Sequence, residues 1–205
     1  MKDELTILRR RFGGHEPGLL GARAEYAVLC PLIDRPDGLH LLFEVRAAAL
    51  RQGGEVCFPG GRREAGESPA DCALRETEEE LSIPAGEIQL LGSGDFIYNQ
   101  RGFLLRPILG LVSPEGFAAM RPSPAEVAET FTAPLSFFRT TPPQIYRYAL
   151  VPQVPPDFPY EEVGVSPAYP WSHGQAEVPI WHWQGHPIWG MTARITADLV
   201  KSFEK

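Results

Sequence analysis

The sequence has few cysteines and no long apolar run. The three cysteines among 205 residues, Cys30, Cys57 and Cys72, form no CxxC pair, and each is surrounded by apolar or small residues. Cysteines in such surroundings are typically buried, reduced thiols, so we expect a reducing compartment and a cytoplasmic location. No run approaches the roughly 18 apolar residues of a membrane span, and the first residues contain no apolar signal segment. We therefore expect neither a disulfide scaffold nor a membrane protein.

Positive charge is also scarce. Nineteen Lys and Arg residues stand against 26 Asp and Glu, which gives a formal net charge of −7. Proteins that bind nucleic acids rely on basic patches, so we expect no nucleic-acid partner. The length, with 22% charged residues, fits a single globular domain over residues 1–205 with an ample core. A homodimer is one arrangement that these features leave open.

The order of apolar stretches predicts an α/β domain. The expected strands cover residues 25–33, 39–45, 55–58, 88–98, 103–112, 126–134, 144–151 and 178–183. Helical spacing of apolar residues predicts a docked amphipathic helix over 2–12, within an N-terminal helix and loop of residues 1–22, and a closing helix over 187–204. Residues 152–176 form a proline-rich loop, and both a lid over a substrate and a passive surface loop remain open interpretations.

A well-capped helix follows the glycine-rich turn at residues 58–61. Ser68 is a strong N-cap residue, and Pro69 suits the first helical position, where its missing N–H costs nothing. Asp71 stands where the acid of a capping box would reach back towards the helix start. We therefore expect a helix that begins at Ser68 and ends near Leu81.

Three glutamates gather in the second half of this helix. Glu76, Glu79 and Glu80 lie at i, i+3 and i+4, which brings their Cβ atoms within about 5–6 Å of one another. Each like-charge pair costs a helix about 0.2–0.5 kcal/mol, and negative charge near a helix C-terminus opposes the macrodipole. A divalent cation would explain the cluster, because Mg²⁺ binds carboxylate and phosphate oxygens together. The alternative is an ordinary solvated acidic face.

The spacing across the turn and helix distinguishes these two interpretations. It reads Gly, five residues, Glu, seven residues, Arg-Glu, two residues, Glu-Glu, one residue, then a position usually held by glycine and an aliphatic residue. The matching positions are Gly61, Glu67, Arg75, Glu76, Glu79, Glu80 and Ile83. This pattern resembles the box of the Nudix hydrolases. It departs from that box at Thr77, where an aliphatic residue is usual, and at Ser82, which replaces the second glycine.

The resemblance implies a Nudix-type α/β/α sandwich with a mixed central sheet. It also implies hydrolysis of the pyrophosphate bond in a nucleoside diphosphate derivative, with Mg²⁺ or Mn²⁺ as cofactor. The expected metal and catalytic carboxylates are those of the helix, with Glu67 as a further ligand or a support for the network. Arg75 would orient these acids. Gly60 and Gly61 would let the backbone approach the metal or the substrate.

Segments outside the box resemble the coenzyme A pyrophosphatase branch of this family over most of residues 23–200. This implies coenzyme A or its thioesters as substrate, with 3′-phosphoadenosine 5′-phosphate and 4′-phosphopantetheine as products. Arg46 and Arg51 become candidates for binding the extra phosphate of coenzyme A, and a surface role for both is the alternative. Glu44 stands where the branch usually has threonine, and Ala47 where it has serine. ADP-ribose, dinucleotides and nucleoside triphosphates are rival substrates, and a non-catalytic nucleotide-sensing module is a second class of function.

Overall fold

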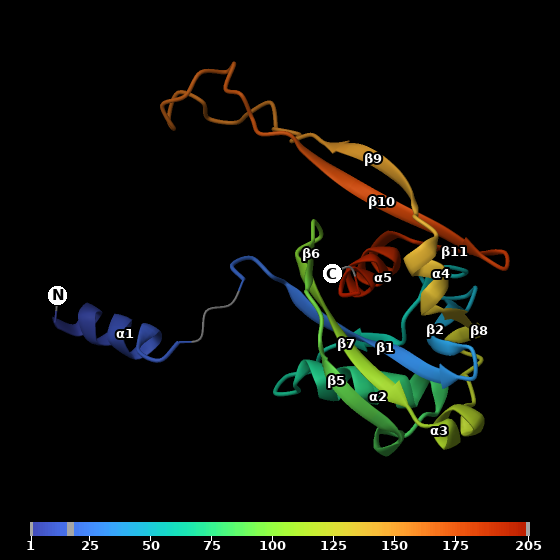
Figure 1. Ribbon diagram of the computed structural model, residues 1–205. Helices are drawn as coiled ribbons and strands as arrows, with labels where there is room; N and C mark the ends of the chain where they lie inside the picture. The colour runs from blue at the N-terminus through green and yellow to red at the C-terminus, as the bar shows by residue number, and fades with distance from the viewer. Residues whose placement is uncertain (1, 16–18, 204–205) are drawn as a thin grey trace.

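A mixed eight-stranded sheet forms the centre of the molecule in this computed structural model, which describes residues 2–15 and 19–203. The main path through the sheet is β3-β2-β1-β7-β5, while β8 pairs with β2, β4 with β1 and β6 with β7 (Figure 1). The strands are β1 (Ala24–Arg35), β2 (Gly38–Arg46), β3 (Val56–Cys57), β4 (Gly60–Arg62), β5 (Ile88–Ser93), β6 (Ile97–Asn99), β7 (Phe103–Val112) and β8 (Val127–Pro134).

The two central strands are parallel, and every other pairing in this sheet is antiparallel. β1 runs beside β7 from the pair Ala24 and Phe103 to the pair Ile33 and Val112. The centre of β1 is a nearly continuous apolar run, as expected for a strand that is covered on both faces. The predicted mixed sheet is therefore confirmed.

Helices cover both faces of this sheet. α2 (Pro69–Leu81) covers one face, where Leu81 is fully buried against the sheet. α4 (Leu135–Thr140) and α5 (Gly190–Lys201) cover the other, where Leu199 belongs to a separate apolar core (Figure 1). Burying one leucine side chain stabilises the fold by about 1.5–3 kcal/mol, so both layers contribute to folding. This arrangement is the α/β/α sandwich that the resemblance implied.

The chain from 84 to 119 contains features that the sequence patterns did not reveal. The single strand expected over 88–98 is two strands, β5 and β6, and each pairs with β7. Between them, the backbone N–H of Gly94 donates a hydrogen bond to the carbonyl of Pro107. The short helices η1 (Ala85–Glu87) and α3 (Pro114–Ala119) were not predicted, because segments of this length carry little periodicity.

A second sheet projects from the domain as a long ribbon. It consists of β9 (Gln144–Leu150), β10 (Gly174–Trp183) and β11 (His186–Trp189). The predicted proline-rich loop joins β9 to β10 at the end of the ribbon that lies farthest from α2 (Figure 1). In this arrangement the loop does not cover α2.

The N-terminal helix is present, but the expected docking is wrong. α1 (Lys2–Phe12) stands apart from the sheet in Figure 1. Leu5, Leu8 and Phe12 are 49%, 51% and 61% exposed. Apolar periodicity predicts which face of a helix is apolar, but not whether a surface exists to receive it. Part of the predicted loop, residues 16–18, lies outside the described residues.

The closing helix begins later than predicted. Ile188 belongs to β11, where it pairs with Trp181 of β10, and is fully buried there. The helix starts at Gly190, whose φ of 65° suits the change from extended to helical backbone. Residue 204 of the predicted range lies outside the described part. Among the described helices, none has both the length and the apolar character needed to cross a membrane.

Candidate active site

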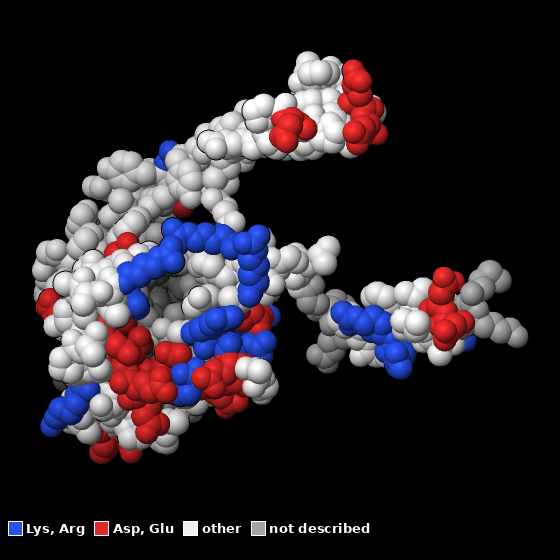
Figure 2. Space-filling view, turned by 180° about the vertical axis from the view of Figure 1, so that it is seen from behind, with Lys and Arg blue, Asp and Glu red and all other residues white. Residues whose placement is uncertain are grey.

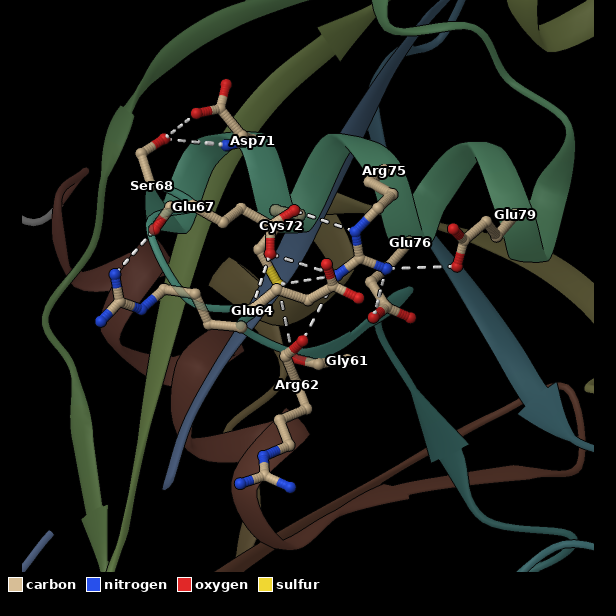
Figure 3. Close-up of polar contacts among 12 residues, drawn as sticks. Gly61, Arg62, Glu64, Glu67, Ser68, Asp71, Cys72, Arg75, Glu76 and Glu79 are labelled. Carbon is tan, nitrogen blue, oxygen red and sulfur yellow. Dashed lines mark hydrogen bonds and ion pairs between the residues drawn. The ribbon is translucent and has the colours of Figure 1, made fainter. Parts of the chain in front are cut away.

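The start of α2 follows from local capping, as predicted. The side-chain oxygen of Ser68 accepts a hydrogen bond of 3.1 Å from the backbone N–H of Asp71 and donates one of 2.6 Å to its carboxylate (Figure 3). Pro69 occupies the first helical position. These contacts fix where the helix begins and hence which face each later glutamate occupies.

The two departures from the box are accommodated locally. Ser82 adopts the left-handed conformation, with φ 57°, that the usual glycine would adopt without strain. Its backbone N–H donates to the Glu78 carbonyl, and its hydroxyl donates to the carbonyl of Arg121. Thr77 is fully buried, and its hydroxyl donates to the Ala73 carbonyl at 2.6 Å. Neither substitution leaves a buried polar group without a partner.

Arg75 is the centre of a carboxylate network (Figure 3). Its Nε donates to Glu67 at 2.9 Å, and its Nη1 donates to Glu76 at 2.8 Å and to Glu79 at 3.2 Å. The bond from Arg75, together with one from the backbone N–H of Glu64, lowers the pKa of Glu67 to about 2. A planar guanidinium thus holds three carboxylates in a fixed relation, which is the orienting geometry expected from the sequence.

Two glycines let these acids approach the backbone. A Cβ atom at Gly61 would lie 2.2 Å from the carboxylate of Glu76, so the glycine creates the space that this carboxylate fills. A Cβ atom at Gly60 would lie 2.3 Å from the carbonyl oxygen of Ala27, because β4 packs tightly against β1. The backbone N–H of Gly60 also donates to Glu80 at 2.8 Å. The structure therefore brings both glycines next to the helix carboxylates.

Two further carboxylates belong to this cluster and were not identified as site residues from the sequence. Glu44 lies in β2 and is only 1% exposed, and Glu126 lies just before β8. The charge of Glu126 contributes to raising the pKa of Glu44, of Glu76 and of Glu80. For Glu44 a signal was present, since it is the one carboxylate in the mostly apolar strand β2.

Burial dominates the electrostatics of the inner acids. Glu80 is 4% exposed, and burial raises its pKa, with a further contribution from the nearby charge of Glu44. Burial likewise raises the pKa of Glu44 and of Glu76. A group of carboxylates that cannot all be ionised without a compensating positive charge is the kind of donor set that hard divalent cations bind.

The donor set suits a hard divalent cation, although the side chains do not converge on one point. Within residues 2–15 and 19–203, no three Asp, Glu, His or Cys side chains are arranged as a finished metal site. Arg75 holds Glu67, Glu76 and Glu79 instead. All donors are carboxylate oxygens, and Glu44 has one oxygen that is buried without a partner, so the residues present suit a hard cation.

Of the two arginines proposed for substrate binding, Arg46 ends β2 and Arg51 lies in the turn that follows. The Nε of Arg46 donates to the backbone carbonyl of Arg51 at 3.4 Å. Arg46 is partly buried and close enough to Glu44 and Glu80 for their charges to interact, whereas Arg51 is exposed. Figure 2 shows a hollow in the domain with acidic side chains gathered on one side and basic side chains along other parts of its rim. Carboxylates and basic groups thus meet around one concave surface.

Comparison with known proteins places this site in a family. The family model described as NUDIX domain matches residues 24–138, from β1 into α4. The chain therefore belongs to the NUDIX domain family and is a Nudix pyrophosphohydrolase.

Individual relatives are informative about the branch. The chain is 34% identical over 181 residues to an uncharacterized Nudix hydrolase, NudL, of Photorhabdus laumondii, covering 87% of this chain and 84% of that protein. It is 30% identical to the mitochondrial coenzyme A diphosphatase NUDT8 of Homo sapiens, covering 92% and 73%. It is 34% identical to the peroxisomal coenzyme A diphosphatase NUDT7 of Mus musculus, covering 65% and 56%. The resemblance to the coenzyme A pyrophosphatase branch is confirmed.

The buried acids predict how stability depends on pH in the absence of metal. The folded protein retains protons on Glu44 and Glu80 at pH values where the unfolded chain, with ordinary carboxyl pKa values near 4.5, has released them. The free energy of unfolding should therefore fall as the pH rises above about 5, because the unfolded state then binds fewer protons than the folded state. Urea unfolding with a chelator, between about pH 5 and about pH 8.5, measures this slope.

Replacing Glu80 with glutamine serves as the control for this pH experiment. Glutamine cannot ionise, so the decline with pH should be shallower in Glu80→Gln than in the wild type. The lowered pKa of Glu67 does not offset this decline. Its contribution to the free energy of unfolding is constant at pH values above the ordinary carboxyl pKa, because Glu67 is then ionised in both the folded and the unfolded state. Equal slopes in the two proteins would contradict the assignment of a raised pKa to Glu80.

Proposed function

We propose that the protein hydrolyses the pyrophosphate bond of coenzyme A or its thioesters in a reaction that depends on Mg²⁺ or Mn²⁺. The products are 3′-phosphoadenosine 5′-phosphate and a 4′-phosphopantetheine product. The observation that carries this proposal is the position of Glu76 and Glu80 beside the Gly60 and Gly61 backbone, in a chain related to two coenzyme A diphosphatases.

The residues of α2 have distinct tasks in this reaction. Glu76, Glu79 and Glu80 hold the cation, and Arg75 sets the relative orientation of the first two. Glu67 binds Arg75 from the other side and thereby supports it. When bound, the cation neutralises pyrophosphate oxygens and lowers the pKa of the attacking water.

Hydrolysis needs a proton acceptor as well as a cation. The oxygen of water forms a bond to one phosphorus while the bond from that phosphorus to the bridging oxygen breaks. One of the helix carboxylates takes the proton of the attacking water, and the bridging oxygen leaves on the other phosphate. Burial of Glu80 next to the Gly60 N–H keeps its carboxylate in place for either holding the cation or accepting the proton.

Substrate choice is assigned to the turn that follows β2. Arg46 and Arg51 contact the 3′-phosphate of coenzyme A, and the hydrogen bond from Arg46 to the Arg51 carbonyl links the two residues. A guanidinium suits this task because it binds phosphate oxygens through two parallel N–H groups. The replacements at Glu44 and Ala47 lie in the same segment, which keeps ADP-ribose, dinucleotides and nucleoside triphosphates as rival substrates.

A non-catalytic nucleotide sensor is the less supported alternative. Such a protein has no need of an ordered acidic network, whereas Glu67, Glu76, Glu79 and Glu80 are all present here and three of them are held by Arg75. The possible homodimer stays a prediction.

A substrate panel tests the proposed function. The purified protein is incubated with coenzyme A, 3′-dephospho-coenzyme A, ADP-ribose and a dinucleotide, each with Mg²⁺ and with chelator, and the products are identified by mass spectrometry. We expect metal-dependent release of 3′-phosphoadenosine 5′-phosphate from coenzyme A, and a lower kcat/KM for the substrate that lacks the 3′-phosphate.

The other outcomes of this panel separate the alternatives. Equal rates with and without the 3′-phosphate would contradict the role of Arg46 and Arg51 while leaving the pyrophosphatase chemistry intact. If only ADP-ribose or only the dinucleotide is cleaved, that compound takes the place of coenzyme A as the proposed substrate. Binding without cleavage of any compound would favour the sensor.

A further inference from the structure

Glu44 is a buried carboxylate outside the Nudix box, and folding alone does not account for it. β2 pairs with strands on both of its edges at this residue, since Glu44 lies opposite Cys57 of β3 and Thr130 of β8. Its neighbours include the fully buried Phe43, and Glu44 itself is 1% exposed. The backbone is therefore held on both sides, and the carboxylate is almost completely shielded from solvent.

The hydrogen bonding of Glu44 is incomplete. One carboxylate oxygen accepts a hydrogen bond of 3.2 Å from the thiol of Cys57, which is a weak donor. The other oxygen is fully buried and has no hydrogen-bond partner. A buried carboxylate with a free oxygen is costly to folding, and an apolar residue of similar volume would serve a purely structural role better.

The groups that face Glu44 are mostly acidic. The charges of Glu76 and Glu126 act on it, and its own charge acts on Glu80. Arg46, two residues along the same strand, is the basic side chain close by, and it is directed to the carbonyl of Arg51. In the described part of the chain, neither Glu44 nor Glu80 forms an ion pair with Lys or Arg.

The carboxylates therefore divide into two sets. Arg75 forms ion pairs with an outer set, which consists of Glu67, Glu76 and Glu79 (Figure 3). In the inner pair, Glu44 accepts from the thiol of Cys57 and Glu80 accepts from the N–H of Gly60. The charge of Arg46 acts on this pair without a direct ion pair to either acid, and a small divalent cation is a group that would bind both carboxylates directly.

We propose that Glu44 is an additional carboxylate of the divalent-cation site, which strand β2 contributes and which binds the cation directly or through one of its water ligands. This inference builds on the metal-dependent chemistry of the proposed function and adds a residue to it. It places the cation on the inner side of the cluster, between β2 and α2, and it explains why a carboxylate occupies a strand position that is otherwise apolar.

Direct measurement of Mn²⁺ binding without substrate tests this proposal. Isothermal titration calorimetry and the electron paramagnetic resonance signal of free Mn²⁺ each give the dissociation constant for wild type and Glu44→Gln. We expect Glu44→Gln to raise the dissociation constant by about 10–100-fold, the range observed when groups supporting a metal site are removed. The matched control is Glu55→Gln, which loses the same charge from a partly buried residue just before β3, where its carboxylate accepts a hydrogen bond from Gln52, and it should leave Mn²⁺ binding within about 2-fold of wild type.

A structural role for Glu44 makes the opposite prediction. If Glu44 is only a protonated partner of Cys57, glutamine keeps the hydrogen bond, so Mn²⁺ affinity stays unchanged and the metal-free protein keeps or gains thermal stability. That result would overturn the proposal. If Glu44→Gln fails to fold, Glu44→Asp retains the charge at a shorter reach. An unchanged dissociation constant in Glu44→Asp would then count against Glu44 as a cation ligand, and a raised one would support it.

Failure of this proposal is distinguishable from failure of the proposed function. Wild-type protein that binds Mn²⁺ and loses affinity on Glu44→Gln, yet does not cleave coenzyme A, keeps this inference and discards the substrate. Metal-dependent cleavage of coenzyme A with unchanged Mn²⁺ affinity in Glu44→Gln would support the proposed function and overturn the role of Glu44. Absence of Mn²⁺ binding by the wild type would overturn both.

Discussion

Replacing Glu80 with glutamine should lower kcat by about 10²–10⁴-fold and leave the fold intact, which is the range that a positioned acid or base typically contributes. The glutamine side-chain oxygen can still accept the hydrogen bond from Gly60, so the local structure persists. The amide cannot carry the negative charge that holds a cation, and it cannot accept a proton from water. Glu79→Gln should also remove most turnover, because Glu79 lies on the same face of α2 and shares Arg75 with Glu76. Steady-state kinetics with the substrate identified by the panel measures both effects.

Glu78 provides the matched control for these two variants. It lies between the other glutamates in the chain, is exposed, and occupies a position where the box accepts any residue. Glu78→Gln removes one negative charge from the same turn of helix and should retain near-normal kcat. Circular dichroism confirms the fold of each variant. Near-normal activity in both Glu79→Gln and Glu80→Gln would refute the site assignment.

Gly61→Ala should reduce kcat/KM by about 10²-fold without unfolding the protein. The added methyl group would lie 2.2 Å from the carboxylate of Glu76, so that side chain must move away. Because Glu76 also bonds Arg75, its displacement disturbs the network, and a misplacement of about 1 Å at a reacting centre can cost about 10²-fold in rate. The neighbour that must yield is the end of a flexible side chain, so the backbone and the unfolding temperature should change little.

Substitutions at two other glycines serve as comparisons for Gly61→Ala. Gly86→Ala adds a methyl group where no heavy atom lies within 4 Å, and its activity should match that of the wild type. Gly60→Ala would place a methyl group 2.3 Å from the Ala27 carbonyl and 2.6 Å from the Val28 Cα, so it should fail to fold well. Wild-type kcat/KM in Gly61→Ala would show that the position of the Glu76 carboxylate does not matter for turnover.

Local signals in the sequence predicted where α2 begins and which of its glutamates share a face. Ser68 and Pro69 define the helix start because capping involves neighbouring residues only. The spacing of Glu76, Glu79 and Glu80 along a helix determines that they share one face, whatever surrounds them. The same holds for most strands, whose apolar patterns marked β1, β2, β7 and β8 within a few residues.

The sequence was less informative wherever the outcome depended on a distant partner. An apolar stripe predicted α1 but could not reveal that Leu5 and Leu8 remain about half exposed. Ile188 fits a helical stripe equally well, and only its pairing with Trp181 of β10 makes it a strand residue. Glu126 carries no motif that marks it as a member of the carboxylate cluster.

The sequence by itself determined the helix that carries the glutamates and its glycine turn, because these depend on spacing along a short segment. The class of reaction followed from the resemblance of that segment to the Nudix box. Only the tertiary structure decided that β2 delivers Glu44 to the inner side of that helix and that Arg75 binds the outer acids but not Glu80. The physical reason is that burial, unlike helical phase, is a property of the whole fold. A carboxylate in an apolar strand joins a charged site only when other elements of the fold place further charged side chains next to it.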